Sequence, residues 1–171
     1  MFRIFADDTG IFFQCKDSNT LIELVKNVLK YVTEWFSNNK LTLNASKTSF
    51  VIFRSSRCRN RNLPDSVTYN NITINRDTQV RYLGLILDEH LNWRAHIDEL
   101  CMKLKRLFPV FYNLRNYLCK SQVRTIYFSM IFSRIKFGCT TYGLCIKENL
   151  DRVQIMQNKL LDQAVLPSSR A

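Results

Sequence analysis

The chain opens with two short apolar segments separated by a polar turn. Residues 2–6 and 11–15 are mainly apolar, and they flank the sequence Asp-Asp-Thr-Gly. This pattern predicts a β-hairpin whose tip carries two adjacent carboxylates. Residues 18–39 then place apolar side chains at i, i+3, i+4 and i+7, which predicts an amphipathic helix.

Between this helix and about residue 91, the chain follows a β-like alternation of apolar and polar positions. The pattern predicts a strand over 48–53, a basic surface loop over 55–66, a small hairpin over 67–74 that turns at Asn70-Asn71, and a further strand over 79–87. The first half of the chain is therefore expected to combine short strands with one long helix.

The second half of the chain is predicted to be helical. Residues 100–118 keep one apolar seam through Pro109, which indicates a single kinked helix. Residues 122–136 are apolar on nearly every side, which predicts a helix buried between layers. Residues 149–165 predict a last amphipathic helix. Together these elements predict the α+β fold class.

The charge is concentrated in the middle of the chain. Residues 57–136 contain fourteen Lys/Arg against six Asp/Glu, which is +8 of the net charge of +11. This concentration favours a polyanionic partner such as nucleic acid, and a merely solvated basic surface is the alternative. The N-terminus lacks the features of a secretory signal, and no apolar stretch approaches the ~20 residues that a membrane helix needs. We therefore expect an intracellular protein, in the nucleus or cytoplasm, without a membrane partner.

The paired carboxylates of the first hairpin are the main chemical signal. Asp7 and Asp8 repel each other unless a cation or a buried partner takes up their charge. Mg²⁺ prefers hard oxygen ligands, and paired metals assist in-line phosphoryl transfer in polymerases. Nucleotidyl transfer is therefore the first hypothesis, and turn chemistry at an Asp-rich hairpin tip is the alternative.

A second group of potential metal ligands lies close together in the sequence. The group consists of Asp88, Glu89, His90, His96 and Asp98. The two histidines are six positions apart, so on one helix they would point to different faces, which argues against a metal site there.

The order of three short motifs resembles a known family. The motif FADDT precedes a long helix, LTLNASKT leads into a strand, and RYLGLILD precedes the basic helical segment. This order resembles the reverse transcriptase of non-LTR (LINE) retrotransposons, with the insect jockey-type elements as the nearest likeness. The resemblance implies part of a polymerase palm, with antiparallel strands and a helix, over residues 1–91. It implies a helical thumb over residues 92–171.

The resemblance assigns roles in catalysis to particular residues. It makes Asp7 a metal ligand, Asp8 its acidic neighbour, and Phe5 the aromatic residue that precedes them. Asn44 and Lys47 match the loop in which the family lysine donates a proton to the departing pyrophosphate, a role that a positioned ammonium group can fill. The alternative for Lys47 is a surface lysine at the entry of a strand.

Contacts to nucleic acid are implied in two places. Tyr82, Leu83 and Gly84 resemble the segment that supports the primer end, where glycine permits close backbone approach. The thumb-like region holds the template and primer duplex through its backbone, and its candidate basic residues are Lys103, Lys105 and Arg106.

The function implied by the resemblance is RNA-directed DNA synthesis. It would use deoxynucleoside triphosphates, Mg²⁺, an RNA template and a DNA primer. Two-metal chemistry also needs a carboxylate from a separate strand, which the family carries upstream. Only five residues precede Ala6, so we expect this chain to be a fragment that is inactive alone and self-associates through an unpaired palm edge. The alternatives are a non-catalytic nucleic-acid-binding module and a functionless retroelement relic.

Overall fold

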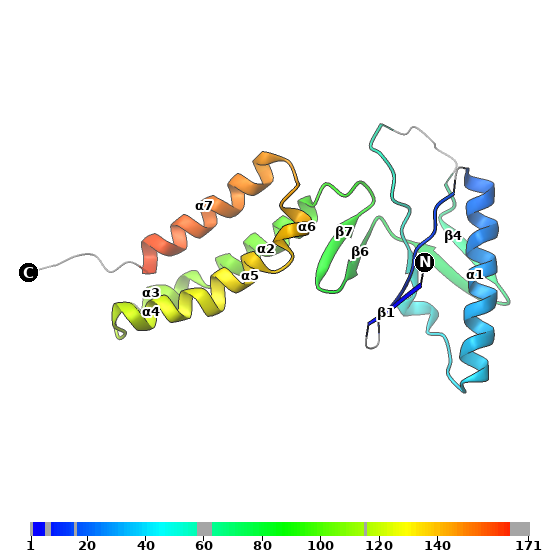
Figure 1. Ribbon diagram of the computed structural model, residues 1–171, viewed down its shortest axis with the longest axis horizontal. Helices are drawn as coiled ribbons and strands as arrows, with labels where there is room; N and C mark the ends of the chain where they lie inside the picture. The colour runs from blue at the N-terminus through cyan, green and yellow to red at the C-terminus, as the bar shows by residue number, and fades with distance from the viewer. Residues whose placement is uncertain (1, 6–7, 16, 58–62, 115, 165–171) are drawn as a thin grey trace, which may run out of the picture. The chain divides into compact units, whose positions relative to one another are not determined.

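The structure is a computed structural model that describes residues 2–5, 8–15, 17–57, 63–114 and 116–164 (Figure 1). It divides into two compact units. The first comprises Met1–Gly84 with Asp88–Leu91, and the second comprises Leu85–Leu87 with Asn92–Ala171. The first unit contains one long helix and most of the strands, and the second contains Leu85–Leu87 of the last strand and the remaining helices. The mixed α+β class expected from the sequence is confirmed.

The first unit begins with the predicted hairpin. Strands β1 (Phe2–Phe5) and β2 (Asp8–Ile11) pair antiparallel, with Phe5 opposite Asp8. The helix α1 (Ser18–Asn38) follows, close to the predicted bounds. Asp17 caps its N-terminus, because the Asp17 carboxylate accepts a hydrogen bond from the Thr20 amide at 2.8 Å.

A three-stranded sheet packs against α1. Its central strand is β5 (Ile72–Arg76), with β4 (Ser66–Tyr69) antiparallel on one side and the short β3 (Ser49–Phe50) parallel on the other. Asn70 and Asn71 have φ values of 45° and 63°, the conformation of a type I′ turn, so the predicted hairpin is confirmed. Between the sheet and α1 lie the buried side chains Leu21, Val25, Leu29, Val67 and Ile74.

The strand predicted over residues 79–87 is wrong as a single element. The structure has two strands there, β6 (Gln79–Tyr82) and β7 (Leu85–Asp88), which pair with each other. Leu83 and Gly84 connect them with φ values of 48° and 82°. The apolar alternation continues through this turn, and only glycine signals the left-handed backbone that reverses the chain.

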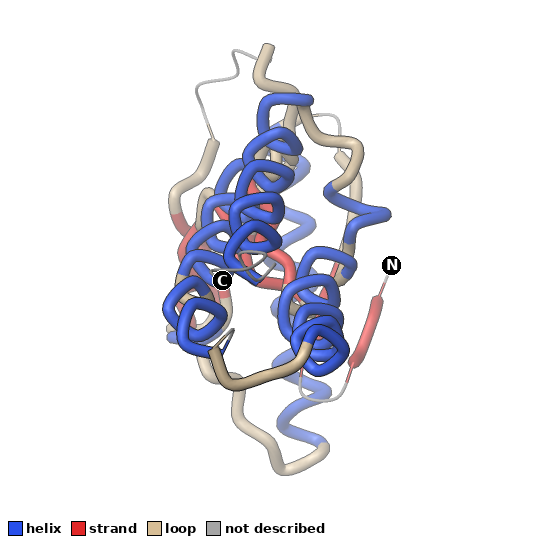
Figure 2. Tube along the Cα trace, turned by 90° about the vertical axis from the view of Figure 1, so that its left-hand side faces the viewer, coloured by secondary structure: helices blue, strands red, loops and turns tan. Residues whose placement is uncertain are grey.

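The second unit is built from helices around one core. They are α2 (Arg94–Lys105), α3 (Phe108–Leu114), α4 (Lys120–Tyr127), the π-helical turn η2 (Phe128–Phe132), α5 (Ser133–Lys136), α6 (Cys139–Tyr142) and α7 (Lys147–Ala164). Helix α7 runs alongside α2 and α3 (Figure 1, Figure 2). The most deeply buried core side chains are Ile97, Leu104, Phe111, Ile131 and Leu160. Within the described part of the chain, no helix is long and apolar enough to cross a membrane.

Two predictions about these helices are wrong in detail. The single kinked helix over 100–118 is two helices, α2 and α3, separated at Arg106–Leu107. Pro109 lies in the first turn of α3, where its missing N–H leaves no hydrogen bond unmade, so it begins a helix rather than kinks one.

The helix predicted over 122–136 does not bury all its apolar residues. In the structure, α4, η2 and α5 follow one another without a break over this range. Their residues Val123, Tyr127 and Ile131 are buried in the core. Phe128 and Phe132, however, are 46% and 36% exposed. The sequence pattern cannot show that the unit covers this helix on one side only.

Candidate functional site

The first hairpin lies against the segment that contains Tyr82. The ring of Phe12, just after β2, meets the ring of Tyr82 edge to face, with centroids 5.8 Å apart. A Cβ atom on Gly10 would lie 3.0 Å from the Phe12 ring and 3.2 Å from the Tyr82 ring. Gly10 therefore permits this close approach, and the fold brings together two of the sequence-predicted segments that lie about 70 residues apart.

The predicted catalytic carboxylates are those of Asp7 and Asp8. Asp7 lies outside the described residues, and for Asp8 the structure defines the backbone, which pairs with Phe5 in the β1–β2 register. The Phe5 side chain is 64% exposed. The donor set fits Mg²⁺ by its chemistry, since two adjacent carboxylates supply hard, anionic oxygens.

Lys47 lies at the end of a short 3₁₀ turn, η1 (Ala45–Lys47). Asn44 caps this turn, because its side-chain oxygen accepts hydrogen bonds from the Ser46 amide at 3.1 Å and from the Ser46 hydroxyl at 2.7 Å. The hydroxyl of Thr48 donates to the Asn44 carbonyl at 2.9 Å. Asn44 thus has a local structural role, and the Lys47 side chain is exposed.

The basic residues predicted for nucleic-acid contact are exposed at the C-terminal end of α2. Lys103 forms an ion pair with Glu99 one turn earlier, at 2.6 Å. Lys105 and Arg106 follow, and the Arg106 guanidinium also contacts the Met102 sulfur at 3.7 Å. This arrangement suits contacts with a phosphate backbone, which needs accessible cations rather than buried ones.

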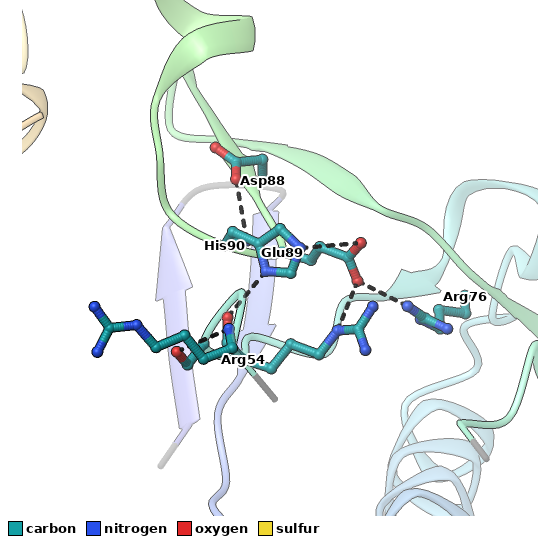
Figure 3. Close-up of polar contacts among 7 residues, drawn as sticks. Arg54, Arg76, Asp88, Glu89 and His90 are labelled. Atoms are coloured by element: carbon teal, nitrogen blue, oxygen red, sulfur yellow. Dashed lines mark hydrogen bonds and ion pairs between the residues drawn. The ribbon is translucent and has the colours of Figure 1, made fainter. Parts of the chain in front are cut away.

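Sequence reasoning missed a cluster of ionic contacts in the first unit. The Glu89 carboxylate accepts hydrogen bonds from Arg76 at 2.7 Å and from Arg54 at 3.3 Å (Figure 3). The His90 ring nitrogen Nδ1 lies 3.1 Å from the Arg54 carbonyl oxygen. Because the two arginines are 13 and 35 positions from Glu89, no local pattern in the sequence could have identified the cluster.

The ionic cluster changes the acidity of Glu89. Burial alone raises the pKa of the Glu89 carboxyl, but the hydrogen bonds from Arg76 and Arg54 outweigh it, so the pKa is lowered. Glu89 is therefore ionised at neutral pH, and its carboxylate is bound by Arg76 and Arg54. Its side chain is 16% exposed, and those of Arg76 and Arg54 are 14% and 25% exposed.

The acidic and histidine residues at positions 88–98 do not act as one group. Glu89 and His90 belong to the cluster just described, whereas His96 is buried among the helices of the second unit, where its Nδ1 accepts a hydrogen bond from the Ile86 amide at 3.4 Å. Asp98 pairs with Arg152 at 2.5 Å. Among the residues described, no three His, Cys, Asp or Glu side chains are placed to hold a metal ion.

The mixture of helices and small sheets is compatible with part of a nucleic-acid polymerase domain. Comparison with known proteins supports this class. The chain is 25% identical over 163 residues to the Drosophila melanogaster protein named "Probable RNA-directed DNA polymerase from transposon X-element". It is 26% identical over 162 residues to the RNA-directed DNA polymerase from mobile element jockey of the same species.

These matches cover 94% and 92% of the chain but 18% and 17% of the two relatives, so the chain spans less than a fifth of their length. The chain is thus a relative of the RNA-directed DNA polymerases of non-LTR retrotransposons and matches a fragment of them. The resemblance stated from the sequence motifs is confirmed. No family model matches the chain, and no solved structure does.

Proposed function

We propose that this chain supplies the catalytic Asp-Asp hairpin and the primer-side elements of an RNA-directed DNA polymerase. The first unit would be the back part of the palm, and the second the thumb. The observation that carries the proposal is the packing of Gly10 and Phe12 against Tyr82, which joins the acidic hairpin to the primer-side segment. The sequence match to the jockey and X-element polymerases over almost the whole chain supports it.

In this proposal, Asp7 and Asp8 bind Mg²⁺. The ion would lower the charge on the triphosphate and favour attack by the primer hydroxyl. The role of the protein would be to supply two adjacent carboxylates, the second of which belongs to the first residue of β2. Two adjacent carboxylates repel each other, and a bound cation would offset this repulsion.

Lys47 is the proposed general acid for the departing pyrophosphate. Its exposure leaves the ammonium group accessible to a bound triphosphate. The Asn44 cap fixes the backbone of η1, which limits the volume that the Lys47 side chain can sample. A proton donor positioned in this way is worth roughly 10²–10⁴-fold in rate.

Nucleic acid would contact both units. Leu83 and Gly84 form the turn after Tyr82, and a glycine with φ of 82° lets a primer backbone approach closely. Lys103, Lys105 and Arg106 would neutralise phosphates of an RNA/DNA hybrid, and deoxynucleoside triphosphates would be the substrates.

Catalysis needs one more carboxylate that faces the hairpin to hold a metal pair. Glu89 is unsuited to this task, because Arg76 and Arg54 already neutralise it. The relatives extend far beyond the matched segment, and we expect the facing carboxylate to come from such a further part. The isolated 171 residues should therefore bind the metal weakly and extend no primer.

Metal-directed cleavage tests the proposal without requiring activity. Fe²⁺ replaces Mg²⁺, ascorbate and peroxide generate hydroxyl radicals, and mass spectrometry maps the backbone breaks. We expect breaks near residues 5–10 and near Tyr82, suppressed by excess Mg²⁺ and abolished by Asp7→Asn. Asp65→Asn, which removes the same charge from an exposed site, should leave the pattern unchanged. An unchanged pattern in folded Asp7→Asn would reject the metal site.

A second candidate function is nucleic-acid binding without catalysis, and the exposed basic end of α2 favours it. The two candidates separate in one pair of measurements. A binding module would hold an RNA/DNA hybrid equally well before and after Asp7→Asn, and it would show no Fe²⁺ cleavage at the hairpin in either form.

A further inference from the structure

The outer face of α4, η2 and α5 exposes two aromatic rings on a well-anchored helix. Phe128 and Phe132 are 46% and 36% exposed, and their ring centroids lie 5.4 Å apart at an interplanar angle of 73°. The same helix buries Val123, Tyr127 and Ile131 in the core of the second unit. The helix that carries the two exposed phenylalanines is therefore packed against the core of the second unit by its opposite side.

One cation lies over one of these rings, and the surrounding sequence contains further cations but no acid. The Arg124 guanidinium lies over the Phe128 ring, 5.7 Å from its centroid. Arg134 and Lys136 are exposed further along the helix. Residues 100–147 contain nine Lys/Arg and no Asp or Glu. A second copy of this face would repel the first, whereas a polyanion would be attracted.

The π-helical turn keeps its backbone satisfied while it carries the rings. The Ser129 hydroxyl donates to the Ile126 carbonyl at 3.0 Å, and the Ser133 hydroxyl donates to the Ser129 carbonyl. These bonds occupy carbonyls in a stretch where the regular helical ladder is altered. Single π-helical turns occur often at functional sites in helices. Here the π-helical turn begins at Phe128 and ends at Phe132, the two exposed aromatic residues of the helix.

We propose that this face binds single-stranded nucleic acid, with unpaired bases stacking on Phe128 and Phe132 and with phosphates contacting Arg124 and Lys136. Flat aromatic rings combined with cations are the means by which proteins hold single strands without reading their sequence. A paired duplex keeps its bases stacked on each other, so it could use the cations but not the rings. The site is distinct from the basic end of α2 and does not depend on the polymerase proposal.

Fluorescence anisotropy with labelled U20, dT20 and an RNA/DNA hybrid tests the proposal on the full chain. The double change Phe128→Ala with Phe132→Ala should weaken binding of at least one single strand by about 10- to 100-fold. Binding of the hybrid should change by less than about twofold. A larger effect on U20 than on dT20 would identify the strand as RNA, and the reverse would identify DNA.

Conservative variants separate stacking from packing. Tyrosine at both positions should retain single-strand affinity within about threefold, whereas leucine at both should behave like alanine, because leucine keeps apolar area but offers no ring. Tyr117→Ala is the matched control, since Tyr117 is 85% exposed and lies outside this helix. It should leave binding unchanged.

Arg124→Gln should reduce the dependence of log affinity on log salt by about 0.7, the value for one phosphate contact on a single strand. Equal losses for single strand and hybrid, retention of affinity by the leucine variant, or a loss in Tyr117→Ala as large as in the double variant would each overturn the proposal. Wild-type binding of U20 and dT20 that the alanine variant leaves unchanged would also overturn it, because the single-strand contact would then lie elsewhere on the chain.

Discussion

Replacement of Glu89 by glutamine should destabilise the first unit in a manner that depends on pH. In the structure, Glu89 is the common partner of Arg76 at 2.7 Å and Arg54 at 3.3 Å. The change removes the negative charge and leaves two guanidinium groups close to each other. The Nε atom of Arg76 is buried and already lacks a hydrogen-bond partner, so this side chain has little capacity to find a new one.

The expected magnitude follows from the exposure of the cluster. Exposed ion pairs contribute about 0–1 kcal/mol, whereas removal of one partner from a fully buried pair costs about 3–5 kcal/mol. Side chains that are 14–25% exposed lie between these limits, so we expect Glu89→Gln to cost about 1–3 kcal/mol. Most of the loss should arise from the 2.7 Å contact, because the 3.3 Å contact with Arg54 is long for a charge-assisted bond.

Amide hydrogen exchange measures the stability of the first unit separately from that of the second. This separation is needed because two units need not unfold in one step. The Arg54 amide donates to the Glu89 carbonyl at 2.9 Å, and the Glu89 amide donates to the Thr78 carbonyl at 2.8 Å. A loss of about 2 kcal/mol would accelerate exchange of these amides roughly 30-fold. Glu34→Gln, which removes the same charge from an exposed position on α1, should leave their exchange unchanged.

The stability that the Glu89 carboxylate contributes should decrease at acidic pH. Because the pKa of folded Glu89 lies below its usual 4.5, the folded state binds fewer protons than the unfolded state as the solution becomes acidic. The stabilisation is therefore complete above about pH 5 and is lost as pH falls through the lowered pKa. Glu89→Gln should flatten this acid branch. An acid branch of equal slope in the variant, or a cost below about 0.5 kcal/mol at pH 7, would refute the reasoning.

Three further predictions concern the second unit. Alanine at Lys103, Lys105 and Arg106 together should reduce the slope of log affinity for an RNA/DNA hybrid against log salt by about two to three units, and an unchanged slope would place the contact elsewhere. Leu104→Ala should destabilise the unit by about 2–5 kcal/mol in urea unfolding, since Leu104 is 0% exposed. Burial, with smaller effects of neighbouring cysteines, raises the pKa of Tyr142 from 10 to about 12. Stability should therefore fall as pH rises from about 10 towards 12, and Tyr142→Phe should remove this slope.

The sequence was informative where one local rule decides the outcome. The turn at Asn70-Asn71 was predictable because asparagine tolerates positive φ, and the observed values of 45° and 63° follow that preference. The turn at Leu83-Gly84 was missed because leucine does not share the preference and the apolar alternation continues through it. Leu83 adopts φ of 48°, so its conformation is imposed by the pairing of β6 with β7 rather than by its own preference.

The candidate site was less predictable than the fold, since its contacts are long-range. The approach of Phe12 to Tyr82 depends on Gly10, which reads in sequence as an ordinary turn residue. The neutralisation of Glu89 by Arg76 depends on how β5 and the segment after β7 are brought together. In each contact the two residues belong to different elements, so the repeat of a single helix or strand cannot predict that they meet. Only the tertiary structure reveals these contacts.

The helix over 120–136 shows why an apolar pattern does not decide burial by itself. A helix that is apolar on every side is expected inside a large core, but a unit of this size has too few elements to cover both faces of each helix. Val123 and Ile131 are buried by the neighbouring helices, and Phe128 and Phe132 are left at the surface. Such exposure reduces solubility unless a ligand uses the surface. Phe128 and Phe132 are apolar residues that the structure leaves exposed, and such departures from the expected pattern are often functional sites. A role of these two rings in binding is an explanation that the proposed variants test directly.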